Sequence, residues 1–145
     1  MATGKPKLRL AVLCAHITPD ADGLPFALNC PLHTIRLPTD PAERNRPREF
    51  ALYVQLQGAW KTTCAFRLQI RDERGEVVYR SAEDSVSFPD FEYRVVPLER
   101  EFRLSFAFPE PGVYFVHVLC EGRSMHDPES PDDRAFPPSQ LNVLG

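Results

Sequence analysis

The stretch that decides the fold is "KTTCAFRLQIRDERGEVVYRS", residues 61–81. Apolar and polar side chains alternate through its first half, and this period of two predicts a half-buried β-strand. Asp72 to Gly75 form a predicted turn, in which the glycine supplies a positive φ. Residues 76–81 then return as the second arm of a hairpin. The side chains that we expect to point inward are Cys64, Phe66, Leu68 and Ile70, and those expected outward are Thr63, Ala65, Arg67, Gln69 and Arg71.

Other segments repeat this pattern on both sides of the hairpin. Fifteen prolines in 145 residues favour many turns and few long helices, because a proline inside a helix removes a donor and clashes with the preceding turn. The arginine-rich segment 41–50 is the best helix candidate, but it is poor in apolar residues and we expect a loop there. We therefore predict an all-β fold, a single antiparallel immunoglobulin-like β-sandwich of about seven to nine strands. Further strands are expected at residues 8–17, 50–60, 91–99, 102–108, 113–121 and 140–144.

Bulk properties limit the function classes. A chain of 145 residues corresponds to one domain, here residues 1–145. The net charge of −3 gives no global attraction to nucleic acid or to anionic lipid, so neither is an expected partner. The apolar run at residues 8–17 is too short for a membrane span, and Thr18-Pro19-Asp20 follows it in place of a cleavage site. We expect a cytoplasmic protein.

Cysteine and histidine spacing suggests one possible metal site. The four cysteines show no C-x-x-C pair, and buried reduced thiols are the simpler interpretation. Two thiolates and two imidazoles can nevertheless bind zinc tetrahedrally. The residues that could do so are Cys14, His16, Cys30 and His33.

Other chemical patterns are incomplete. "DADG" at residues 20–23 begins like a calcium loop but lacks the later acidic ligands, so we expect a turn. His117 and Cys120 are three residues apart, which puts them on opposite faces of a strand and excludes a catalytic pair. The arginine cluster of residues 36–48 is interleaved with glutamates and predicts a solvated loop. No nucleophile motif or phosphate-binding loop is present, so we expect neither catalysis nor a cofactor.

The segment "FPEPGVYFVHVLCEGR", residues 108–123, predicts a corner followed by a central strand. Tyr114, Val116, Val118 and Cys120 share the face that we assign to the core. A tyrosine after such a corner resembles the tyrosine corner of immunoglobulin-like sandwiches, although Val116 stands where that motif has a cysteine. The opposite face carries Phe115, His117 and Leu119, and it is apolar enough to need a loop or a partner over it.

The chain as a whole resembles a family of short bacterial cytosolic proteins of unknown function with an immunoglobulin-like sandwich. Three stretches carry the resemblance: residues 8–38, the hairpin at 66–79, and residues 106–123. The resemblance implies the fold and supplies no catalytic residues. The loops at 39–48 and 122–138 are longer than the pattern requires.

Two hypotheses about function follow. The first is a non-enzymatic protein-interaction or scaffolding module that binds a protein partner, or a second copy of itself, through an exposed sheet face and long loops. The alternative is a zinc-stabilised or metal-dependent protein that uses Cys14, His16, Cys30 and His33, or the loop around His126. The contact residues expected for the first hypothesis are Phe115, His117, Leu119, Arg123 and His126.

Overall fold

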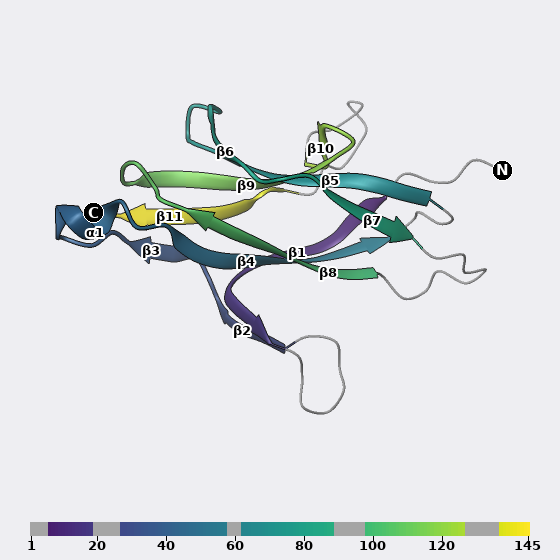
Figure 1. The fold of residues 1–145 in the computed structure, drawn as a ribbon, viewed down its shortest axis with the longest axis horizontal. Helices are drawn as coiled ribbons and strands as arrows, with labels where there is room; N and C mark the ends of the chain where they lie inside the picture. Colours follow the sequence, from purple (N-terminus) through teal and green to yellow (C-terminus); the bar gives the residue numbers. More distant parts are fainter. Residues whose placement is uncertain (1–5, 19–26, 58–61, 89–97, 127–136) are drawn as a thin grey trace.

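The protein forms two stacked β-sheets with one short helix. The computed structural model describes residues 6–18, 27–57, 62–88, 98–126 and 137–145, and of residues 16–18 and 27–31 it describes the backbone. Figure 1 shows β5 and β9 in one layer above β4 and β8 in the other. The first sheet has four strands in the order β2 (Ala27–Pro31), β1 (Lys7–Thr18), β4 (Arg48–Gln57) and β8 (Leu98–Phe106).

The second sheet has seven strands and is the larger layer. Its main path runs β3 (Thr34–Arg36), β11 (Ser139–Leu144), β9 (Gly112–Cys120), β5 (Thr62–Arg71) and β6 (Val77–Arg80). Two short strands lie beside this path: β7 (Asp84–Phe88) pairs with β5, and β10 (Arg123–Ser124) pairs with β9. The expected hairpin at residues 61–81 is confirmed as β5 and β6.

The sandwich core is where the alternating apolar residues meet. Phe66 of β5 is fully buried and its ring lies 6.3 Å from that of Phe102 on β8, so the contact joins the two sheets. Tyr114, Val116 and Val118 of β9 are buried on the same side, as expected from their spacing. Apolar burial of this kind supplies most of the folding free energy, at about 25 cal/mol per Å² removed from water.

Strand β4 is buried on both faces, which the sequence pattern did not indicate. Leu52, Val54 and Leu56 face the main core. Tyr53, on the other face of the strand, is only 5% exposed and packs with Cys14 and Ala51 in a second, smaller cluster. The register explains the cluster, because Tyr53 lies opposite Val12 and Ala51 lies opposite Cys14 on β1.

Three fold predictions need correction. The described residues form eleven strands, not seven to nine, because segments as short as two or three residues show no readable alternation. The sheets are not purely antiparallel, since β3 and β11 pair in parallel. Residues 41–44 form a helical turn, α1 (Pro41–Arg44), where we expected a loop. Asp40 caps this turn by accepting a hydrogen bond from the Ala42 N–H at 3.0 Å, and Pro41 suits its first position.

Candidate functional site

The predicted contact face on β9 is largely covered. His117 and Leu119 are 6% and 7% exposed, and Phe115 is half-buried. We expected either a loop or a partner over this face, and His117 and Leu119 are covered by the chain itself. The cover comes from the chain immediately after β9, which folds back as β10 and pairs Ser124 with Leu119.

A small polar network holds this cover in place. His117 Nδ1 and Ser124 Oγ form a hydrogen bond at 2.8 Å, and the His126 N–H donates to the same Ser124 oxygen at 3.2 Å. His126 is also buried, and its Nε2 accepts a hydrogen bond from the Val118 N–H at 3.0 Å. A ring nitrogen that accepts cannot carry a proton, so this contact requires neutral His126 protonated on Nδ1. His117 and His126 thus act as structural groups here.

The turn between β9 and β10 has the conformation of a tight β-hairpin. Glu121 and Gly122 have φ values of 51° and 82°, the positive pair that a type I′ turn needs. Glu121 also continues the ladder with β5, because its N–H donates to the Ala65 carbonyl at 2.9 Å and its Oε1 accepts from the Ala65 N–H at 2.7 Å. Arg123 is exposed and lies opposite Cys120, whose side chain faces the core side of β9. Arg123 is therefore not on the same face of the sheet as Leu119.

The outward side chains of β5 lie beside those of β9. Arg67 is opposite Leu119, Gln69 is opposite His117, and Arg71 is opposite Phe115. On the other edge of β5, Arg80 of β6 is opposite Gln69. We call this surface the arginine face; it consists of Arg67, Gln69, Arg71, Arg80, Phe115, His117 and Leu119. The sequence predicted that the β5 residues point outward, but it did not show that they adjoin the β9 residues.

A hollow of about 200 Å³ lies in the arginine face above Arg67. Arg80 and Glu83 line one side, and Leu119 and Gly122 line the other. Within the described part of the chain, Arg67 Nε is the only buried side-chain nitrogen or oxygen without a hydrogen-bond partner. Leaving a buried donor unsatisfied costs about 1–3 kcal/mol, so this atom is a marked exception to ordinary packing.

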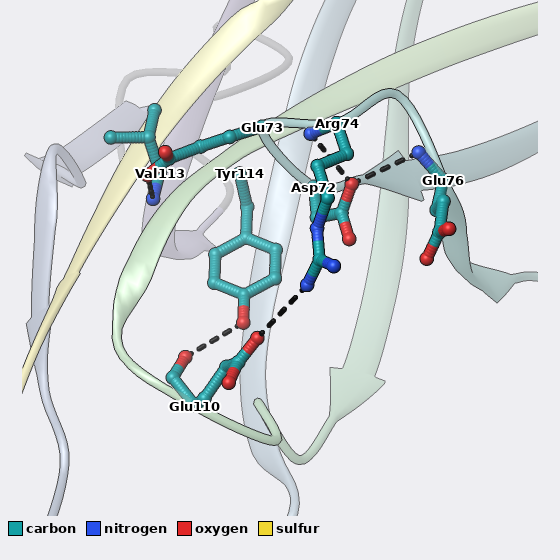
Figure 2. Close-up of polar contacts among 7 residues, drawn as sticks. All are labelled: Asp72, Glu73, Arg74, Glu76, Glu110, Val113 and Tyr114. Atoms are coloured by element: carbon teal, nitrogen blue, oxygen red, sulfur yellow. Dashed lines mark hydrogen bonds and ion pairs between the residues drawn. The ribbon is translucent and has the colours of Figure 1, made fainter.

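The opposite end of β5 is fixed by a different set of polar contacts, shown in Figure 2. Asp72 Oδ1 accepts from the N–H groups of Arg74 and Glu76 at 2.9 Å and closes the β5–β6 turn. Glu73 Oε1 accepts from the Val113 N–H at 2.8 Å, which ties this turn to the start of β9.

Tyr114 forms the predicted corner beside these contacts. Its hydroxyl donates to the Glu110 carbonyl at 2.7 Å. Burial raises the pKa of Tyr114, and the nearby Glu110, Asp72 and Glu73 carboxylates raise it further. These contacts hold loops together and present no open site.

A larger cavity, of about 350 Å³, is lined by residues of the four-stranded sheet together with Tyr79. It contains Arg103, whose Nε donates to Glu101 Oε1 at 3.0 Å. Because this arginine already has a carboxylate partner, the larger cavity offers less free hydrogen-bonding capacity than the hollow above Arg67.

The proposed zinc ligands are only partly described. Cys14 is fully buried in the Tyr53 cluster, its Sγ lies 3.7 Å from the Val12 carbonyl, and burial raises the pKa of its thiol. His33 is exposed. The side chains of His16 and Cys30 lie outside the described part. The register pairs Cys14 with Pro31 and His16 with Asn29. The zinc hypothesis stays a prediction, which elemental analysis of the purified protein decides.

The remaining candidates are structural or undescribed. In the arginine cluster, Arg48 Nη2 donates to the Arg36 carbonyl at 2.6 Å and Arg44 Nε donates to the Pro38 carbonyl at 2.9 Å, so both side chains hold the turn around α1. The "DADG" segment at 20–23, residues 127–136 of the long loop and most of the expected strand at 91–99 lie outside the described residues. Among described residues, no group of three or more histidines, cysteines, aspartates or glutamates is placed to hold a metal ion.

Comparisons with known proteins show no family. No protein-family model matches the chain, and no curated protein matches it. Among solved structures, one similar chain is described as "Crystal structure of the C-terminal domain of wzt". The identity is 14% and the TM-score 0.48, over all of this chain and 77% of the other. In the described parts, no helix has the length and apolar character needed to cross a membrane.

Proposed function

We propose that the protein is a non-enzymatic interaction module that binds an acidic protein segment on the arginine face. The observation that carries the proposal is the row of three arginines, Arg67, Arg71 and Arg80, on one sheet surface of a protein with net charge −3. Of the residues lining the hollow there, only Glu83 is acidic. A local positive surface of this kind attracts a negatively charged partner and orients it.

The face also has the mixed character of a contact surface. The half-buried Phe115 supplies apolar area next to the arginines, and arginine and aromatic residues are enriched where proteins bind each other.

Two finer assignments belong to the same proposal. We assign the sandwich to the immunoglobulin-like class, supported by the Tyr114–Glu110 corner. We place the protein in the cytoplasm, a location that the free buried thiols of Cys14 and Cys64 suit.

The test is a binding titration with a defined acidic probe. Fluorescein-labelled deca-glutamate is titrated with the protein at low salt and followed by anisotropy. We expect saturable binding that weakens about fivefold in Arg80→Glu, since the reversal replaces attraction by repulsion. The control is Arg103→Glu, which changes an 83% exposed arginine on the four-stranded sheet and should bind as the wild type does.

Three outcomes would contradict the proposal. They are no binding of deca-glutamate by the wild type, an equal loss in both variants, and tighter binding of a labelled ten-nucleotide thymidine strand under the same conditions. The last result would assign the face to nucleic acid. Circular dichroism melts of both variants check that each is folded.

A further inference from the structure

We infer that the hollow above Arg67 is a subsite for one carboxylate side chain, an aspartate or a glutamate of the acidic partner. This inference rests on the proposed function and makes it specific. Its starting point is Arg67 Nε, a buried donor with no hydrogen-bond partner among the described residues. Arg67 is one of the residues that line the hollow, together with Leu119 of β9 and Arg80 of β6.

The chemistry of the donor selects the ligand. A guanidinium offers its Nε–H and one Nη–H side by side, and these two parallel donors match the two oxygens of a carboxylate. Because the Nε atom is buried, a carboxylate reaches it only when the Arg67 side chain turns towards the hollow, and the ligand would then satisfy the unpartnered Nε–H. Arg80 lines the same hollow and adds a second positive charge near the bound oxygens.

The volume of the hollow is large enough for one acidic amino-acid side chain. One water takes about 30 Å³ of liquid volume, so the space of about 200 Å³ is several waters in size and accommodates a carboxylate with its methylene groups. Leu119 provides an apolar wall for those methylenes.

Glu83 disfavours a more highly charged ligand. It lines the hollow on the Arg80 side, and a phosphate dianion would meet stronger repulsion from its carboxylate than a single carboxylate would. The hollow is therefore better matched to an acidic side chain than to phosphate.

The structure also gives a reason why the hollow exists. β6 and β7 both pair with the same edge of β5, and the chain between them leaves that edge at residues 81–83. The Ser81 hydroxyl accepts a hydrogen bond from the Leu68 N–H at 2.8 Å in this gap. Glu83 and Arg80 are thus held at the rim of the hollow by the break between two strands.

The first measurement uses the wild-type protein. The Arg67 Nε–H resonance is followed by NMR while the capped tripeptide acetyl-Gly-Glu-Gly-amide is added. We expect a saturable shift, with no shift from acetyl-Gly-Gln-Gly-amide and none at Arg103. No response at Arg67, or the same response to both peptides, would overturn the subsite.

The second measurement uses a variant that keeps the charge. Arg67→Lys retains the positive charge but cannot present two parallel donors, so its affinity for deca-glutamate should fall on the order of tenfold, the effect of one charge-assisted hydrogen bond. Arg103→Lys is the matched control and should bind as the wild type does. Unchanged binding in Arg67→Lys overturns the subsite.

The outcomes separate the two proposals. If the wild type binds deca-glutamate and Arg67→Lys binds it equally, the subsite fails and the proposed function stands. If Arg67 responds to the glutamate tripeptide but deca-glutamate does not bind, the subsite stands and the proposed function fails. Displacement of the glutamate tripeptide by inorganic phosphate, more effective than by acetate at the same ionic strength, would overturn the carboxylate assignment.

Discussion

Tyr114 connects the interior of the sandwich to its surface loop. Its ring packs against Phe108 with centroids 4.9 Å apart, while its hydroxyl reaches the Glu110 carbonyl. A buried tyrosine needs a partner for its hydroxyl, and here the partner is the loop that leads into β9. The side chain therefore fixes the β8–β9 corner through a single hydrogen bond.

We expect Tyr114→Phe to lower the free energy of unfolding by about 1 kcal/mol, because it removes this hydrogen bond and leaves the ring in place. Urea denaturation measures the change. Tyr79→Phe is the matched control: Tyr79 packs on Phe106, and no hydrogen bond of its hydroxyl is seen among the described residues. An equal loss in both variants would show that the corner bond contributes nothing.

Alkaline pH should weaken the fold through the same residue. Burial raises the pKa of Tyr114 above its ordinary value of 10.0, because the charged phenolate is disfavoured inside the protein. The unfolded chain then loses its proton first, so stability falls as pH rises above about 10. Urea titrations at pH 8.5 and pH 10.5 should show this fall, and it should be smaller in Tyr114→Phe. Burial also raises the pKa values of Tyr53 and Cys14. These two residues account for the loss of stability at high pH that remains in Tyr114→Phe.

The Glu121–Gly122 turn depends on one glycine. Gly122 has a φ of 82°, where an added Cβ is strained even though no atom lies within 4 Å of it. We expect Gly122→Ala to cost about 1 kcal/mol and Gly122→Asn to cost less, because asparagine tolerates this conformation. Thermal melts of the two variants give the comparison. Equal melting temperatures would mean that the turn adopts another conformation in solution.

At the scale of elements, β11 is the strand on which the larger sheet depends. It lies between β3 and β9, and its Leu141 and Val143 are buried in the core. The parallel pair with β3 is supported at its ends by hydrogen bonds from the Leu37 N–H to Leu144 and from the Asn142 N–H to His33. Loss of β11 would expose the edges of two strands at once.

We expect Leu141→Ala to destabilise the protein by about 2–5 kcal/mol, the range for removing a buried leucine side chain. Gln140→Ala alters the neighbouring position, which is exposed, and should change stability by less than about 0.5 kcal/mol. Chemical denaturation of both variants tests the difference. Similar small effects in both would show that β11 is not part of the cooperative core.

The sequence predicted those elements in which alternation is long and regular. The β5–β6 hairpin and the core face of β9 follow from residues 61–81 and 113–121, and both are confirmed. The parallel pairing of β3 with β11 could not be predicted. The three residues 34–36 are too few to show an alternation of apolar and polar side chains, and their partner strand is distant in the sequence. A cover over His117 was expected, but the sequence did not show that the turn after β9 supplies it by bringing Ser124 and His126 back onto β9.

The arginine face, too, could be predicted only in part from the sequence. Alternation alone assigned Arg67, Gln69 and Arg71 to the outside of β5. Their position beside Phe115, His117 and Leu119 depends on the pairing of β5 with β9, which no local pattern records.

For the whole molecule, the position of the arginines bears on the oligomeric state. A two-fold dimer through the arginine face would bring the arginines of both copies into one interface. Like charges in contact are unfavourable, so we expect a monomer by light scattering at low salt. A dimer that is lost in Phe115→Glu would contradict this and would assign the face to self-association.

The insertion of β11 between β3 and β9 has a consequence for biosynthesis. Residues 34–36 leave the ribosome early, but their neighbour in the sheet is not translated until residues 142–144. During that interval the edges of β3 and β9 remain open to other extended chains, and such edges promote aggregation. We therefore expect a nascent chain of this protein to need shielding of its unpaired strand edges until residues 142–144 have been translated.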